Sequence, residues 1–174
     1  MRWVGLVRNV MVGRDGLHRA ALLDAVEQAG GADARSYITT GNVTFDADEA
    51  DVDDVTLRLE AAISDVVQRP TMVAVRSLAW VRDLVAQDVF AGYDRAAWEL
   101  EVSFLRPGAP PLDPATVPAS YRTEVVAAWD WGLATARPPD GTQRPHVNRL
   151  LERANGLPAT ARGWGTLVRL AEGG

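Results

Sequence analysis

Residues 35–45 of the chain read RSYITTGNVTF, and this stretch decides the fold that we predict. Both of its arms are rich in β-branched and aromatic residues, and a Gly-Asn pair lies between them. Such a pattern is typical of two short strands joined by a tight turn. Gly and Asn both tolerate the positive φ values that tight turns require. We therefore predict a β-hairpin that turns at Gly41-Asn42.

The segments on either side of this hairpin alternate between strand and helix patterns. Trp3–Val7 is a continuous apolar run that predicts a buried first strand, and Thr71–Val75 predicts a later one. Apolar spacing predicts a helix over Leu17–Ala29 and a second one that follows the acidic run and ends before Pro70, with Val66 on its apolar face. The resulting order is strand, helix, strand, strand, helix, strand. That order is typical of a ferredoxin-like unit, in which helices cover one face of an antiparallel sheet.

The second half follows the same plan less clearly. Residues 98–104 alternate between apolar and polar side chains and predict a half-buried strand. The proline-rich segment 107–118 predicts a loop with at most one helical turn, where a complete unit would carry a helix. A hairpin over 123–137, a short helix over Val147–Ala154, a last short strand and a closing helix follow. The second half is therefore a degenerate copy of the first.

These patterns predict an α+β fold of two ferredoxin-like (α/β-plait) halves, with antiparallel sheets and helices on one face. The first half is expected over residues 1–90 and the second over residues 98–174, with a connector over 91–97. The prediction rests on the order of the elements, since the two halves show no sequence repeat.

The composition excludes several classes of chemistry. The chain has no Cys, so disulfides, Cys-ligated zinc and Cys nucleophiles are excluded. It also has no Lys, which excludes Schiff-base catalysis and a P-loop lysine. A net charge of −5 argues against nucleic acid as a partner. No signal peptide or membrane-spanning run is recognisable, so we expect a cytoplasmic bacterial protein without a membrane partner.

Three segments together carry a family resemblance: Leu6–Gly13, Tyr37–Phe45 and Thr160–Leu167. In their order and spacing the chain resembles the uncharacterised bacterial domain-of-unknown-function family numbered 1697. The resemblance implies a tandem α/β-plait fold and no activity. The chain departs from the family pattern where Asn9, Met11, Gly163 and Gly165 stand for the usual glycine or asparagines. If a family function depends on those asparagines, these departures alter it.

The resembling segments place Arg, Gly and Asn at the ends of the predicted elements, where loops commonly carry function. We predict a site for a small anionic ligand where the N-terminal loop, the Gly-Asn hairpin and the C-terminal Arg-x-Trp segment meet. Its candidate residues are Arg8, Asn9, Gly13, Arg14, Gly41, Asn42, Arg162, Trp164 and Thr166. A loop between a strand and a helix can hold an anion on backbone N–H groups, and arginine adds paired hydrogen bonds.

Each of these features also has a purely structural interpretation, which stays open. Arg8 would pair with an acidic side chain, and Gly41-Asn42 would serve as a turn alone. Trp164 would anchor the last helix in the core, with Arg162 capping or pairing beside it.

Other polar groups indicate no metal site or cofactor. The acidic run Asp46–Asp54 lacks the spacing of a calcium loop and is expected to favour the dipole of the helix that follows. His18 and His146 have no partner at metal-binding spacing. His18 is expected in the first turn of the first helix, either exposed or as a general base near the loop.

Two other classes of function remain. One is a protein- or nucleic-acid-binding module that uses a sheet surface, for which Tyr37, Trp129 and Trp131 would have to face solvent together. The other is an enzyme, for which the sequence offers no recognisable catalytic set. The sequence predicts neither the identity of the ligand nor the oligomeric state.

Overall fold

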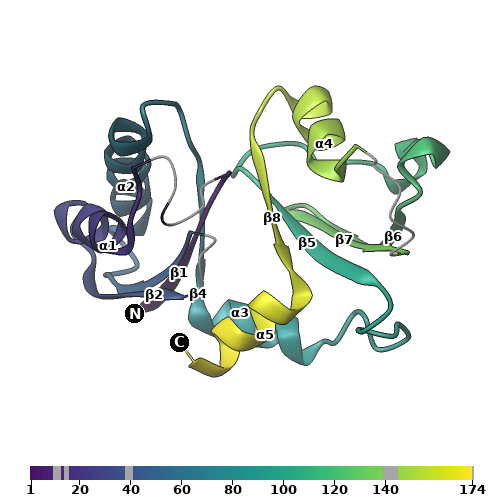
Figure 1. Cartoon of the computed structure of the whole chain (residues 1–174), viewed down its shortest axis with the longest axis horizontal. Coiled ribbons are helices and arrows are strands. Elements are labelled where there is room, and N and C mark those ends of the chain that lie inside the picture. The colour runs from purple at the N-terminus through teal and green to yellow at the C-terminus, as the bar shows by residue number, and fades with distance from the viewer. Residues whose placement is uncertain (10–12, 14–15, 38–40, 139–144, 174) are drawn as a thin grey trace. The chain divides into compact units, whose positions relative to one another are not determined.

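The computed structural model describes residues 1–9, 13, 16–37, 41–138 and 145–173 of the chain. These residues form two four-stranded antiparallel sheets and five α-helices, so the protein is α+β as predicted (Figure 1). They divide into two compact units. Unit 1 comprises Met1–Asp83 with Arg169–Gly174, and unit 2 comprises Leu84–Val168. The division falls inside two helices, α3 (Leu78–Ala86) and α5 (Trp164–Gly173).

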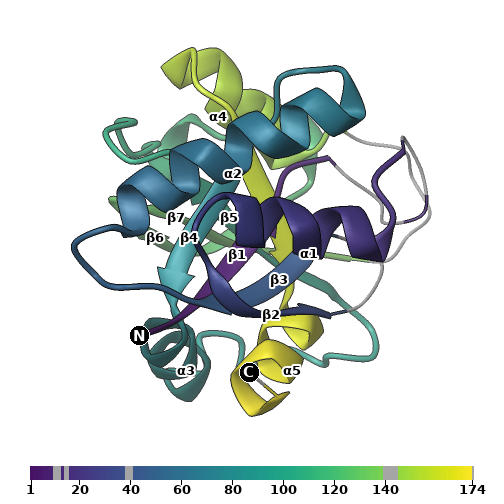
Figure 2. The same cartoon turned by 90° about the vertical axis from the view of Figure 1, so that its left-hand side faces the viewer.

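Unit 1 is built on a sheet with the strand order β2-β3-β1-β4. Its elements are β1 (Arg2–Val7), α1 (Arg19–Gln28), β2 (Ala32–Tyr37), β3 (Asn42–Asp46), α2 (Val52–Val67) and β4 (Val73–Ser77). Helices α1 and α2 both lie over one face of the sheet (Figure 2). The core of unit 1 lies between that face and the two helices.

The register of β1 explains why that face is apolar. Trp3 pairs with Phe45 and Val7 with Val73, so alternate residues of three strands point to the same side. These side chains pack in one buried cluster with Leu22 of α1 and Leu59 of α2. Removing so much apolar surface from water stabilises the layer of helices on the sheet.

Unit 2 is built on a sheet with the strand order β6-β7-β5-β8. Its elements are β5 (Glu99–Leu105), the 3-10 turns η1 (Pro114–Thr116) and η2 (Ala119–Tyr121), β6 (Glu124–Trp129), β7 (Gly132–Arg137), α4 (Val147–Asn155) and β8 (Ala159–Gly163). The 3-10 turn at 114–116 lies where the sequence predicts at most one helical turn. Val147 and Leu151 of α4 pack on Leu105, Leu133 and Ala159 of the sheet.

Several local predictions differ from the structure. Asn42 is not part of the turn: it is the first residue of β3 and is fully buried. Val66 is 36% exposed, because it lies beside the buried stripe of α2 and not within it. Helix α1 begins at Arg19 and not at Leu17, since His18 is its N-cap.

Candidate functional site

The backbone of the loop after β1 is held by hydrogen bonds with one other segment of unit 1, residues 69–72 between α2 and β4. The N–H of Arg8 donates to the carbonyl of Met72 (2.8 Å), and the hydroxyl of Thr71 donates to the carbonyl of Arg8 (3.0 Å). The guanidinium of Arg69 donates to the carbonyl of Asn9 (2.8 Å). Asn9 has a φ of 50°, a left-handed conformation that Asn tolerates better than most residues. Two arginines, Arg8 and Arg69, therefore belong to one fixed loop cluster.

The hairpin loop reaches the same place. The N–H of Val7, the last residue of β1, donates to the carbonyl of Gly41 (2.8 Å). Gly41 has a φ of 62°, and the Nδ2 of Asn42 donates to the carbonyl of Tyr37 (3.2 Å), which closes the hairpin on itself. Gly41 and Arg8 are therefore neighbours across the end of β1. We call Arg8, Asn9, Gly41, Asn42 and Arg69 the β1-end cluster.

In the sequence, the β1-end cluster is followed by α1, and Gly13 and residues 16–18 are the described residues between them. The N–H of Gly13, which has a φ of 95°, donates to the carbonyl of Leu17 (2.8 Å). The Nδ1 of His18 then accepts the N–H of Ala21 (3.2 Å) and caps the helix. His18 is exposed but is the N-cap, and not a member of the first turn as predicted. Arg14 lies outside the described residues.

Arg162, Trp164 and Thr166 belong to unit 2. Arg162 pairs with Val102 across β5 and β8, so its side chain lies on the sheet face opposite α4. It is 7% exposed, and its Nη1 donates to the Oγ1 of Thr160 (3.0 Å) and to the carbonyl of Ala161 (2.8 Å). Burial lowers the pKa of Arg162 to about 10, which leaves the guanidinium charged at neutral pH.

Trp164 anchors the start of α5. It is 3% exposed and meets Phe90 edge to face, with 5.1 Å between the ring centroids. Its indole Nε1 is buried and has no hydrogen-bond partner among the described residues. Thr166 is half-buried on the same helix. These contacts agree with the structural interpretation of Trp164, and the approach of this segment to the β1-end cluster stays a prediction.

The structure adds an arginine that the sequence interpretation missed. Arg76 pairs with Val4 across β1 and β4, just as Arg162 pairs with Val102 across β5 and β8. Each arginine lies two residues before a helix, and burial lowers the pKa of both guanidinium groups. In both halves an arginine is the second-last residue of the strand that precedes a helix. This correspondence is recognisable only once β4 and β8 are aligned. Arg69 was missed because no local pattern predicts a contact across 60 residues.

The three aromatic residues of the sheet-surface hypothesis each make contacts within their own unit. Tyr37, Trp129 and Trp131 are all half-buried. The hydroxyl of Tyr37 donates to the carbonyl of Gly173 within unit 1. Trp129 and Trp131 stack on each other in unit 2, with 4.5 Å between ring centroids and 10° between ring planes.

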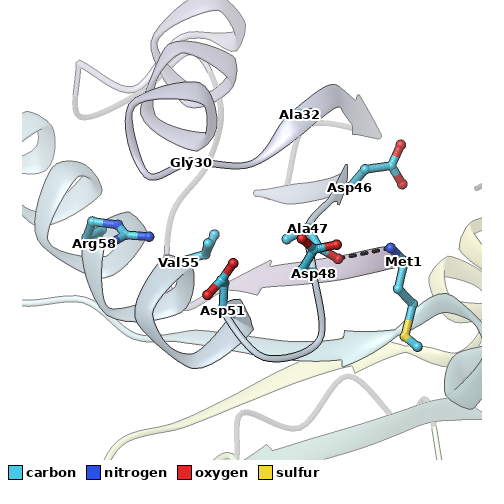
Figure 3. Close-up of a pocket in the computed structure, with 9 residues that line it drawn as sticks. All are labelled: Met1, Gly30, Ala32, Asp46, Ala47, Asp48, Asp51, Val55 and Arg58. Atoms are coloured by element: carbon cyan, nitrogen blue, oxygen red, sulfur yellow. Dashed lines mark hydrogen bonds between the residues drawn. The ribbon is translucent and has the colours of Figure 1, made fainter.

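The acidic run lines a pocket of about 340 Å³ at the start of α2 (Figure 3). Asp46, Asp48 and Asp51 contribute carboxylates, and Arg58 contributes a guanidinium whose Nε donates to the carbonyl of Ala29 (2.8 Å). The N-terminal amine of Met1 donates to the carbonyl of Ala47 (2.9 Å), the bond drawn in Figure 3. Among the residues that the structure describes, no group of three or more His, Asp or Glu side chains is placed to hold a metal ion.

The comparisons with known proteins agree with this fold. A family described as protein of unknown function (DUF1697) matches residues 1–128. The chain belongs to this family. The conserved bacterial protein SP0830 from Streptococcus pneumoniae has a similar structure, with a TM-score of 0.70 and 16% sequence identity over 98% of this chain and 96% of that one. A search of curated proteins finds no match.

At that level of identity the likeness to SP0830 concerns the fold alone, and the family carries no described activity. No helix among the described residues is long and apolar enough to cross a membrane.

Proposed function

We propose that this protein binds a small anionic ligand, and that the β1-end cluster provides the site in unit 1. The observation that carries the proposal is the contact between Arg69 and the backbone of Asn9. It holds the guanidinium of Arg69, which follows α2, against the loop that Arg8 begins. Guanidinium groups supply the paired N–H donors that match carboxylate and phosphate oxygens.

The surrounding backbone supports the same class of ligand. Helix α1 follows the cluster in the sequence, and the dipole at the N-terminus of a helix favours negative charge. The hairpin places Gly41 against Val7, so the backbone lies close to the cluster without a bulky side chain. The other predicted members, Arg14, Arg162, Trp164 and Thr166, remain part of the proposal as sequence predictions.

We also propose that each unit is a ferredoxin-like plait. The support is the shared strand order. In each unit the first strand, β1 or β5, lies between the third and the fourth strand of that unit. In unit 1 two helices lie on one sheet face, and in unit 2 α4 lies alone with the two 3-10 turns in place of a first helix.

A thermal-shift screen tests the ligand proposal. The probes are inorganic phosphate, sugar phosphates, nucleotides and dicarboxylates. A ligand present at a hundredfold excess over its Kd stabilises the folded state by about 2.7 kcal/mol, which raises Tm by several degrees. We expect Arg8→Gln and Arg69→Gln each to reduce the shift that the best probe produces.

Arg35→Gln is the matched control, because Arg35 is exposed on β2 and pairs with Asp33 outside the cluster (3.0 Å). It removes one positive charge from unit 1 and should leave the shift unchanged. The proposal fails if no anion stabilises the protein. It also fails if all three variants reduce the shift equally, since that result indicates general charge attraction.

A further inference from the structure

A second pocket lies entirely within unit 2, and none of the candidate site residues lines it. Its volume is about 420 Å³, within the range of pockets that hold small molecules. It lies between the start of β6, the end of β7 and the segment that contains η2. Its apolar wall is formed chiefly by Trp98, Pro118 and Pro138, and its polar wall by Arg122 and Glu124.

The polar wall presents one charge of each sign. Arg122 follows η2 in a left-handed conformation (φ 44°), and its N–H donates to the carbonyl of Ala119 (2.9 Å). Thr123 separates it from Glu124 and donates its hydroxyl to the carbonyl of Tyr121 (3.0 Å). The two charged residues are thus carried on a short segment whose backbone is fixed on both sides.

Tyr93 lies beside both walls of the pocket. Its ring meets the indole of Trp98 edge to face, with 5.3 Å between centroids and 73° between planes. Burial and the nearby negative charge of Glu124 raise the pKa of Tyr93, so the phenol stays protonated. Tyr93 therefore packs against the aromatic wall and lies near the acid.

We propose that this pocket binds a small zwitterion with an apolar body, of which a free apolar α-amino acid is the simplest example. Arg122 binds the carboxylate, and Glu124 accepts the ammonium protons. Trp98 and the two prolines contact the apolar side chain. The pocket is lined by one cation and one anion, and a zwitterion carries the two complementary charges.

The test is a titration of the full chain, labelled with ¹⁵N at its tryptophans, followed through the indole N–H signals. The variant Trp98→Phe identifies the Trp98 signal among those of the six tryptophans. The probes are L-phenylalanine, 3-phenylpropionate, which lacks the ammonium, and phenethylamine, which lacks the carboxylate. We expect L-phenylalanine to shift the Trp98 signal saturably, and each truncated probe to bind about tenfold more weakly or worse.

Variants assign the two charges separately. Arg122→Gln should remove the preference for L-phenylalanine over phenethylamine, and Glu124→Gln the preference over 3-phenylpropionate. Tyr93→Phe keeps an aromatic ring against Trp98 but removes the phenol hydroxyl near Glu124, so it should weaken only the preference that depends on the ammonium. Arg8→Gln should leave all these titrations unchanged, which separates this site from the β1-end cluster.

Three results would overturn the proposal. The first is a Trp98 signal that does not move with L-phenylalanine. The second is equal binding of all three probes to the wild-type protein, which would indicate an apolar wall without charge recognition. The third is a shift confined to Trp129 and Trp131, which would place the ligand on the stacked indoles. The second needs no variant, so it holds even if a substitution prevents folding.

Discussion

Glu101 shows how one partly buried residue of unit 2 depends on its neighbours for its charge. Burial alone raises the pKa of its carboxyl, but the hydrogen bond to His146 and the positive charge of Arg137 lower it below its ordinary value. The Nε2 of His146 lies 2.9 Å from Glu101. The Nδ1 of the same ring accepts the N–H of Asn148 (3.1 Å), so we assign the ring proton to Nε2. His146 thereby caps α4 and binds β5 at once.

This arrangement predicts a pH dependence with a definite sign. A carboxyl whose pKa is lowered by folding stabilises the folded state above its unfolded pKa, and that contribution is lost as the pH falls through the folded pKa. The loss should therefore begin near the ordinary value of 4.5 and continue below it. We expect Glu101→Gln to lower the free energy of unfolding by about 1 kcal/mol at pH 7. The variant should also lose less stability than the wild type as the pH falls below that value.

Urea unfolding at a series of pH values measures both effects. Glu99→Gln is the control, because Glu99 bonds to the same Arg137 (2.7 Å) but its side chain is 55% exposed. An exposed ion pair contributes little, so this variant should follow the wild type. Parallel curves for the wild type and Glu101→Gln would contradict the assignment.

At the scale of the element, the hairpin of β6 and β7 depends on a close backbone approach. A Cβ added to Gly132 would lie 2.0 Å from the carbonyl oxygen of Ser103 on β5. The carbonyl of Trp131 accepts the N–H of Leu105 (2.9 Å), which holds the turn against β5. A contact with backbone cannot be relieved by a side-chain rotation, so the central strand must move if a side chain is added.

We therefore expect Gly132→Ala to destabilise the protein by about 3 kcal/mol or more. Gly165→Ala is the matched substitution in α5, where an added Cβ meets nothing within 4 Å. It should stabilise the protein by about 0.5–1 kcal/mol, because alanine loses less backbone entropy in a helix. Thermal or urea unfolding of both variants measures the difference. Equal unfolding midpoints for Gly132→Ala and the wild type would show that β5 can move without a loss of stability, and would contradict the prediction.

The elements that the sequence predicted well are those whose pattern is local. The alternation from Trp98 to Phe104 marks β5, and the continuous apolar run Trp3–Val7 marks β1. Asn42 was placed in a turn because a Gly-Asn pair is a turn signal, yet strand pairing with Leu6 draws it into β3. A local pattern contains no information about such a partner.

The candidate site likewise contains some residues that a local pattern indicates and others that no local pattern indicates. Arg8 and Gly41 could be singled out because each stands at the end of a predicted element. Arg69 could not, because its role arises from a bond to Asn9 that only the folded chain creates. Arg122 follows the proline-rich segment and Glu124 lies at the start of the predicted hairpin, and neither position carries a sequence signal for a pocket.

At the scale of the whole molecule, the chain's last residues belong to the unit that its first residues build. Arg169–Gly174 are part of unit 1, although α5 begins in unit 2. The Nε of Arg82 in α3 donates to the carbonyl of Ala171 (2.9 Å), and the hydroxyl of Tyr37 in β2 donates to the carbonyl of Gly173. Two elements of unit 1 therefore use the end of α5 as a hydrogen-bond partner.

This connection predicts that deletion of residues 169–174 destabilises unit 1. The deletion removes Leu170, which is fully buried, together with the acceptors of Arg82 and Tyr37. Burial of one leucine contributes about 1.5–3 kcal/mol and each lost hydrogen bond about 1 kcal/mol, so we expect a loss of about 3–5 kcal/mol. Amide hydrogen exchange localises the effect: protection should fall in β2 and α3 more than in β7.

Two variants separate the contributions within that deletion. Tyr37→Phe removes one hydrogen bond and keeps the ring, so it should cost about 1 kcal/mol. Leu170→Ala should cost about 2–5 kcal/mol, the range for a leucine truncated in a core. If the deletion lowers protection equally throughout both sheets, the chain unfolds as one cooperative body. If protection in β2 and α3 does not change, the end of α5 does not stabilise unit 1, and the prediction is wrong.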